Sequence, residues 1–197
     1  SGWTLTENRA LRSAIPGRSS APLAHRDLAG PGDWSYIGTM KTRIYMETSV
    51  VSYLTARPSR DITVAAHQTS TRDLWDRLGE FDVYISELVV SEASKGDPGA
   101  AQLRLAAVAD FDELALDDEA KELARALIAG SAVPEEYPED ALHLAVAAVN
   151  GMQVVVTWNF KHVNNPFTRM MTRQIVENNG YGCPEICSPE ELLGDDR

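Results

Sequence analysis

Apolar residues in the stretch 138–163 follow two different patterns, one after the other. Residues 141–149 are apolar on almost every side, and the P-E-D start at 138–140 suits the first turn of a helix. The N-G pair at 150–151 is a stop signal, and the β-branched run at 153–157 is typical of a strand covered on both faces. This stretch therefore predicts a buried helix that lies on a sheet and leads into an interior strand.

The same alternation of helix and strand patterns extends to both sides of this stretch. Helices are expected from about residue 50, over 62–78, 100–108, 117–130 and 168–178, and from residue 189. A short helical turn is expected at 87–92. Strands are expected at 43–46, 81–86, 111–116 and 185–187. Because strands that alternate with helices usually form a parallel sheet, the sequence predicts an α/β fold with a mostly parallel central sheet covered by helices.

Residues 1–39 show no such periodicity. They contain glycine, proline, serine and scattered arginine, whereas the strand pattern begins cleanly after Met40. We therefore expect residues 1–39 to be a leader or flexible N-terminal extension, Met40 to be the natural start, and residues 40–197 to form the domain. The alternative is that Trp3, Trp34 and Tyr36 dock on the domain surface.

Composition narrows the class of protein. The chain has 197 residues, 44% of them apolar, and no apolar run long enough to span a bilayer, so one soluble globular domain without a membrane segment is expected. The two cysteines, Cys183 and Cys187, lack a second Cys/His cluster that would complete a zinc site. Reduced thiols and a cytoplasmic location are expected.

The net charge of -11 argues against a broadly basic nucleic-acid-binding surface. Solubility is the simplest explanation of this charge, and a cation-binding rim is an alternative. A local basic patch stays open as a hypothesis, and its candidate members are Arg43, Arg57, Arg60, Arg169 and Arg173.

Four polar residues fall at expected strand ends or helix starts: Glu47, Glu92, Asp140 and Asn159. The carboxyl ends of parallel strands share one rim, so these side chains are expected to lie close together. Converging carboxylates repel one another unless a cation joins them, and Mg²⁺ and Mn²⁺ favour oxygen ligands. The spacing is therefore compatible with a metal site, although Glu47 could simply cap the following helix.

Four short motifs, in order along the chain, resemble those of the PIN domains of the VapC type, the metal-dependent ribonucleases of toxin–antitoxin systems. These motifs are I-Y-M-E-T-S-V-V-S-Y-L at 44–54, S-E-L-V-V-S-E at 86–92, E-D-A-L-H-L-A-V-A at 139–147 and T-W-N-F-K-H-V at 157–163. The resemblance covers residues 41–193 and includes a branch with T-W-N-F-K-H in place of an aspartate motif. It implies a PIN-like three-layer fold.

The resemblance also assigns roles to residues. The family's first acid, an Asp followed by Thr or Ser, corresponds to Glu47, and its helical Glu corresponds to Glu92, with Glu87 as the less favoured candidate. The third and fourth acids correspond to Asp140 and Asn159. Two positions depart from the family pattern, since Asp becomes Glu at 47 and Asn at 159. The expected catalytic and metal-binding set is Glu47, Glu92, Asp140 and Asn159.

Other residues near these motifs have open roles. Thr48 is expected to support the first carboxylate. His143 follows Asp140 by three residues and is either a ligand or a locally hydrogen-bonded side chain, and His162 either approaches a phosphate or lies on the surface. For Trp158, core packing is favoured over base stacking.

Together these observations predict an endoribonuclease that uses Mg²⁺ or Mn²⁺ to activate water for phosphodiester cleavage. The resemblance implies an RNA substrate, an antitoxin protein as partner and a homodimer. The alternative is a catalytically weak or inactive PIN-fold module that binds RNA or protein without cleavage. An unrelated α/β hydrolase is disfavoured, because no G-x-S-x-G nucleophile motif is present.

Overall fold

The computed structural model describes residues 41–194. The expected extension at 1–39 and Met40 lie outside the described residues. The described elements, in chain order, are β1 (Thr42–Met46), α2 (Thr48–Thr55), α3 (Ile62–Asp76), η3 (Leu78–Glu80), β2 (Phe81–Ser86), α4 (Glu87–Ala93), α5 (Pro98–Val108), β3 (Asp112–Leu114), α6 (Asp118–Ala129), α7 (Pro138–Val149), β4 (Val154–Val156), α8 (Pro166–Asn178), β5 (Glu185–Cys187) and α9 (Pro189–Leu193).

The five strands form one parallel sheet in the order β3-β2-β1-β4-β5. Strand β1 is central, and its Ile44 lies opposite Val83 of β2 and Val154 of β4. The chain builds β2 and β3 on one side of β1 and then crosses to β4 on the other side. This reversal of strand order is where open α/β sheets place their ligands, beyond the carboxyl ends of the strands. The predicted α/β class is confirmed, and the sheet is parallel throughout.

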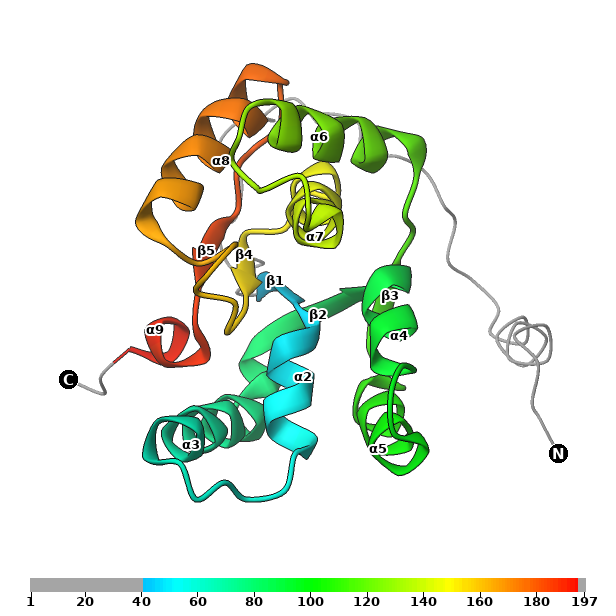
Figure 1. Ribbon diagram of the computed structural model, residues 1–197, viewed down its shortest axis with the longest axis vertical. Helices are drawn as coiled ribbons and strands as arrows, with labels where there is room; N and C mark the ends of the chain where they lie inside the picture. Colours follow the sequence, from blue (N-terminus) through cyan, green and yellow to red (C-terminus); the bar gives the residue numbers. More distant parts are fainter. Residues whose placement is uncertain (1–40, 195–197) are drawn as a thin grey trace, which may run out of the picture. The chain divides into compact units, whose positions relative to one another are not determined.

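Helices cover both faces of the sheet, which gives three layers (Figure 1). Helices α6, α7 and α8 lie on one side, and α2, α3 and α5 lie on the other. Helix α4 follows β2 directly and contacts both α2 and α7, so it closes the edge between the two helical layers.

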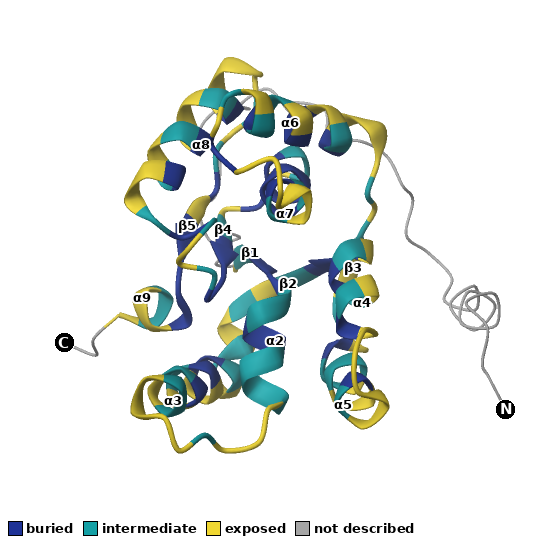
Figure 2. Cartoon of the chain, viewed as in Figure 1, coloured by how far each residue is buried: buried dark blue, intermediate teal, exposed yellow. Residues whose placement is uncertain are grey.

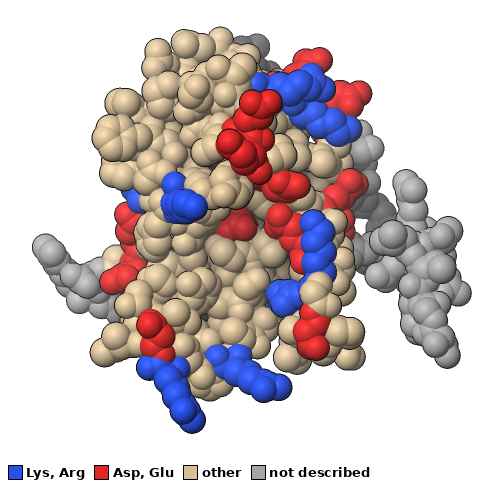
Figure 3. Space-filling model, viewed as in Figure 1, with Lys and Arg blue, Asp and Glu red and all other residues tan. Residues whose placement is uncertain are grey.

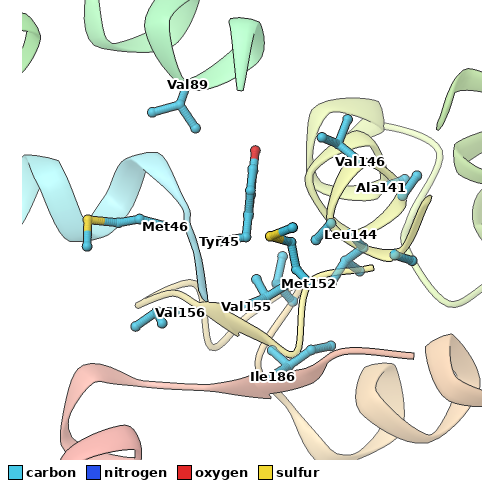
Figure 4. Packing of buried hydrophobic residues seen from close by; sticks show 14 of the residues in the cluster. Tyr45, Met46, Val89, Ala141, Leu144, Val146, Met152, Val155, Val156 and Ile186 are labelled. Carbon is cyan, nitrogen blue, oxygen red and sulfur yellow. The ribbon is translucent and has the colours of Figure 1, made fainter. Parts of the chain in front are cut away.

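The core lies where α7 packs on β1 and β4. Side chains of Tyr45, Leu144 and Val155 are fully buried, and most residues of α7 are buried as well (Figure 2). Figure 4 shows the Tyr45 ring rising from β1 with its hydroxyl directed toward Val89 of α4. Residues 141–149 are apolar on almost every side because α7 packs against the sheet on one side and against neighbouring helices on the others.

Three helices begin about two residues earlier than predicted, and the first of them is α2, which starts at Thr48 and not at about residue 50. Helix α5 starts at Pro98 and not at residue 100, and α8 starts at Pro166 and not at residue 168. Proline is well suited to a first helical turn, and the side chains of Asp97 and Asn165 accept backbone N–H bonds as N-caps. The helix predicted over 62–78 is divided into α3 and the 3₁₀ turn η3.

The structure also bears on the cysteines and on membrane insertion. Cys183 and Cys187 are free thiols, and burial raises the pKa of Cys187 to about 12. Within residues 41–194, none of the helices has both the length and the apolar character that crossing a membrane requires.

Truncating the core contact of α7 tests the packing. Leu144→Ala should lower the free energy of unfolding by about 2–5 kcal/mol, because Leu144 is fully buried and leaves a cavity. Leu103→Ala on α5 is the matched control, and with 57% exposure it should change that free energy by less than about 0.5 kcal/mol. Urea unfolding measures both, and equal losses would contradict the described packing.

Candidate metal centre

The carboxylate of Glu47 lies at the carboxyl end of β1 and has two different oxygens. Oε2 accepts hydrogen bonds from the Ser49 amide at 3.1 Å, from the Ser49 hydroxyl and from the Thr157 hydroxyl at 2.8 Å. This oxygen caps α2. The other oxygen, Oε1, lies 3.8 Å from Nε2 of His143. Capping of α2 therefore uses one oxygen of Glu47, and the other oxygen is left facing His143.

The second carboxylate is that of Glu92, which α4 supplies just after β2. Its Oε2 accepts a hydrogen bond from the Thr48 hydroxyl and lies 3.1 Å from His143 Nε2. The expectation that Thr48 supports the first carboxylate is wrong, because the start of α2 turns this hydroxyl toward α4; Ser49 and Thr157 support Glu47 instead. Glu87, the less favoured candidate, is exposed at the start of α4.

His143 lies between these two carboxylates. Ligand atoms of Glu47, Glu92 and His143 all lie within 4.8 Å of one another, a grouping that could hold a metal ion. The imidazole is 1% exposed, and its second nitrogen, Nδ1, is 2.7 Å from the hydroxyl of Tyr45. That hydroxyl is in turn 2.7 Å from the Ser86 hydroxyl, so a buried chain of polar groups ends at the carboxylates.

Asp140, Asn159 and His162 form a second group. Asn159 Nδ2 donates to Asp140 Oδ1 at 3.0 Å, and His162 Nδ1 lies 3.1 Å from Asp140 Oδ2. Asn159 Oδ1 accepts from the His162 amide at 3.0 Å. Asn159 thus joins the start of α7 to the loop after β4, and both oxygens of Asp140 have partners. Metal ligation by Asp140 and Asn159 stays a prediction.

The two groups are close enough for their charges to interact. Burial raises the pKa of Asp140, the negative charge of Glu47 adds to this rise, and the hydrogen bonds from Asn159 and His162 offset only part of it. Figure 3 shows acidic side chains on this face between the part built by α6 and α7 and the part built by α2 and α4. The rim therefore has several acids at close range, which is the setting that favours a bound cation.

Hydrogen bonding shifts the pKa values of His143 and Glu92. Burial alone would lower the pKa of His143, but its hydrogen bond to Glu92 and the charges of Glu47 and Glu92 raise it above the ordinary value. Burial opposes ionisation of Glu92, yet the bonds from His143 and Thr48 hold its pKa below the ordinary value. The same contact thus favours the charged form of both partners, His143 and Glu92.

Aromatic rings surround the loop that carries Asn159. The indole of Trp158 is buried, stacks on His67 at 4.1 Å and donates to Thr71 at 2.8 Å, so its predicted place in the core is confirmed. The ring of His162 lies 3.8 Å from that of Tyr137. Both contacts hold the loop against the body of the domain.

The candidate basic patch is partly occupied by ion pairs. Arg169 pairs with Glu191 at 2.9 Å, and Arg173 pairs with Glu185 at 2.7 Å. These two guanidinium groups already have carboxylate partners, which weakens their case as RNA contacts.

The pairing of His143 with Glu92 gives stability that depends on pH. A raised histidine pKa contributes stability that is fully present below its ordinary value of 6.5 and is lost as the pH rises through the folded-state pKa. The lowered Glu92 pKa contributes stability above 4.5 that is lost as the pH falls through its folded-state pKa. We expect His143→Gln to lower the Tm more at about pH 5.5 than at about pH 9, in EDTA. Scanning fluorimetry measures both differences, and equal values would refute the pairing.

Placing an acid at position 159 tests the link to Asp140. Asn159→Asp replaces the 3.0 Å hydrogen bond by two neighbouring carboxylates, so the metal-free Tm should fall by about 3–8 °C, or ~1–2 kcal/mol. Mn²⁺ should then raise the Tm of this variant more than that of the wild type, because a cation relieves the added repulsion. An unchanged metal-free Tm would show that the side chain at 159 does not face Asp140.

No protein-family model and no curated protein matches this chain by sequence. Solved structures with similarity include VapBC2 from Rickettsia felis bound to a DNA fragment from their promoter, at 12% identity over 75% of this chain and 98% of that chain, with a TM-score of 0.48. The sarcin–ricin-loop-cleaving toxin VapC20 of Mycobacterium tuberculosis has 16% identity over 70% and 95%, with a TM-score of 0.45. Tyrosyl-tRNA synthetase of Archaeoglobus fulgidus complexed with L-tyrosine has 12% identity over 76% and 56%, with a TM-score of 0.40.

Proposed function

We propose that this protein is a PIN-type endoribonuclease that requires a divalent metal ion. The observation that carries the proposal is the convergence of Glu47, Glu92 and His143 within 4.8 Å at the carboxyl ends of β1 and β2. Asp140 is close enough to Glu47 and His143 for their charges to interact, and it accepts a hydrogen bond from Asn159. These two residues correspond to the third and fourth positions of the family motif. The order of the four motifs and the place of their polar residues on one rim both support this assignment.

The side chains present fit a divalent cation. Glu47 and Glu92 supply carboxylates from two different elements. Hydroxyl groups position both carboxylates, and Oε1 of Glu47 faces His143. Ligands fixed by neighbouring hydrogen bonds in this way are typical of metal sites. A bound Mg²⁺ or Mn²⁺ would supply Lewis-acid polarisation of a phosphodiester.

A second group of side chains, formed by Asp140, Asn159 and His162, would act at the edge of this metal site. Asp140 is held by Asn159 and His162, and its side chain is 17% exposed, so it faces the rim without being free to turn. In this proposal Asp140 completes the metal-binding set, and Asn159 positions it as a neutral replacement for the family's fourth acid. The loss of one negative charge lowers the repulsion that an empty site must tolerate.

The partners implied by the family resemblance belong to the same proposal. They are an RNA substrate, a separate antitoxin protein and a second copy of the chain in a homodimer. The rival proposal is a PIN-fold module that binds RNA or protein without cleaving it, and the two departures at Glu47 and Asn159 favour it. The retained cluster of Glu47, Glu92 and His143 favours the enzyme, because binding alone does not require buried carboxylates that repel one another.

RNA cleavage separates the two candidates. Purified full-length protein should cleave RNA in Mn²⁺ or Mg²⁺ and lose this activity in EDTA, because the metal is part of the site. Glu92→Gln should reduce the cleavage rate by at least about 100-fold, since it removes a carboxylate of the metal centre. Glu87→Gln is the matched control on the same helix, with an exposed side chain, and should cleave like the wild type.

Cleavage by Glu92→Gln at the wild-type rate would remove Glu92 from the site. RNA binding without any metal-dependent cleavage in the wild type would favour the binding module.

A further inference from the structure

We propose that His143 binds the metal ion directly through Nε2, so that the centre combines nitrogen and oxygen ligands and prefers Mn²⁺, Co²⁺ or Zn²⁺ over Mg²⁺. This inference rests on the metal requirement of the proposed function and adds a ligand and a class of metal. Neutral imidazole is a good ligand for transition metals, whereas Mg²⁺ favours oxygen ligands and retains its waters.

The distances between donor atoms already suit this centre. Metal–ligand bonds of about 2.0–2.2 Å place neighbouring ligand atoms of an octahedral site about 3 Å apart. Nε2 of His143 is 3.1 Å from Glu92 Oε2 and 3.8 Å from Glu47 Oε1. A cation that joins the two carboxylates would therefore contact the imidazole edge without a large movement of any side chain.

The imidazole cannot easily leave this place. The ring is 1% exposed and lies on the buried side of α7, and its Nδ1 is held 2.7 Å from the Tyr45 hydroxyl. A cation next to Nε2–H would meet a like partial charge, so the arrangement requires a lone pair at Nε2 when metal is bound. Because His143 is buried and held in place, it would either bind a cation at this centre through Nε2 or, with Nε2 protonated, repel it.

The second nitrogen supports the ligand role. Histidines that bind metals usually donate a hydrogen bond through the other ring nitrogen, which fixes the tautomer and the ring orientation. Here Nδ1–H can donate to the Tyr45 oxygen while the Tyr45 hydroxyl donates to Ser86 at 2.7 Å. The Ser86 oxygen also accepts from the Val89 amide at 3.5 Å. This direction of the chain leaves the Nε2 lone pair aimed at Glu47 and Glu92.

Pulsed electron paramagnetic resonance of the full chain loaded with Mn²⁺ tests the ligand. The Mn²⁺ signal should show coupling to imidazole nitrogen, and this coupling should vanish in His143→Gln. His67→Gln is the matched control, because His67 stacks on Trp158 and contacts none of the proposed ligands. The coupling should persist in that variant. Its loss in His67→Gln, or its absence in the wild type, would overturn the proposal.

Calorimetric titration tests the class of metal and does not depend on folding of a single variant. The wild type should bind Co²⁺ at least about tenfold more tightly than Mg²⁺, and Tyr45→Phe should weaken Co²⁺ binding by about 10–100-fold, because the ring loses its support. Equal affinities for Co²⁺ and Mg²⁺ in the wild type would contradict a nitrogen ligand.

These measurements distinguish two failures. Mn²⁺ binding that Glu92→Gln abolishes, without nitrogen coupling, would refute His143 as a ligand and leave the proposed metal-dependent ribonuclease standing. Mn²⁺ binding that Glu92→Gln leaves unchanged would remove the proposed metal centre itself, and the role of His143 would fall with it.

Discussion

The carboxylate of Glu47 is the interaction on which the arrangement of the rim depends. Its Oε2 accepts hydrogen bonds from Ser49 at the start of α2 and from Thr157 just after β4. Its backbone amide donates to Val156 at 3.1 Å and so continues the pairing of β1 with β4. One side chain thus joins three elements at their ends, and its remaining oxygen is directed to the candidate site as a consequence.

The longer glutamate arm is consistent with this double use. The carboxylate at position 47 must accept a hydrogen bond from the backbone amide of Ser49 with one oxygen and face His143 of α7 with the other. The second departure, at Asn159, has a similar logic. The amide donates to Asp140 and accepts from the loop, which a carboxylate could not do because it has no N–H to donate. Both departures therefore change how the acids are held, and only the one at Asn159 also removes a negative charge.

Local patterns predicted most of the fold. The strand at 81–86, the helix at 138–149 and the strand at 185–187 agree with β2, α7 and β5, because their periodicity and end signals are contained in a few neighbouring residues. Helices α5 and α8 start two residues before the predicted positions, because the N-caps Asp97 and Asn165 and the prolines that follow them begin each helix ahead of its apolar pattern.

The site was only partly predictable. Glu47, Glu92, Asp140 and Asn159 could be placed on one rim, since strand ends meet there in a parallel sheet. The division into two groups could not, because it depends on side-chain rotamers. Tyr45 and Ser86 were missed for the same reason. Their contact with His143 joins two strands and a helix that are far apart in the chain, and no local spacing signals it. Thr157 could have been found, as the first residue of the T-W-N-F-K-H-V motif.

The buried chain from Ser86 through Tyr45 to His143 also constrains how the sequence can diverge. Replacing His143 by an aliphatic residue would leave the Tyr45 hydroxyl without one of its two partners in a fully buried place, and replacing Tyr45 by phenylalanine would do the same to the imidazole. Each such single change leaves a buried polar group without one of its partners. The three side chains are therefore coupled energetically, and the loss of one lowers the stabilisation that the other two contribute.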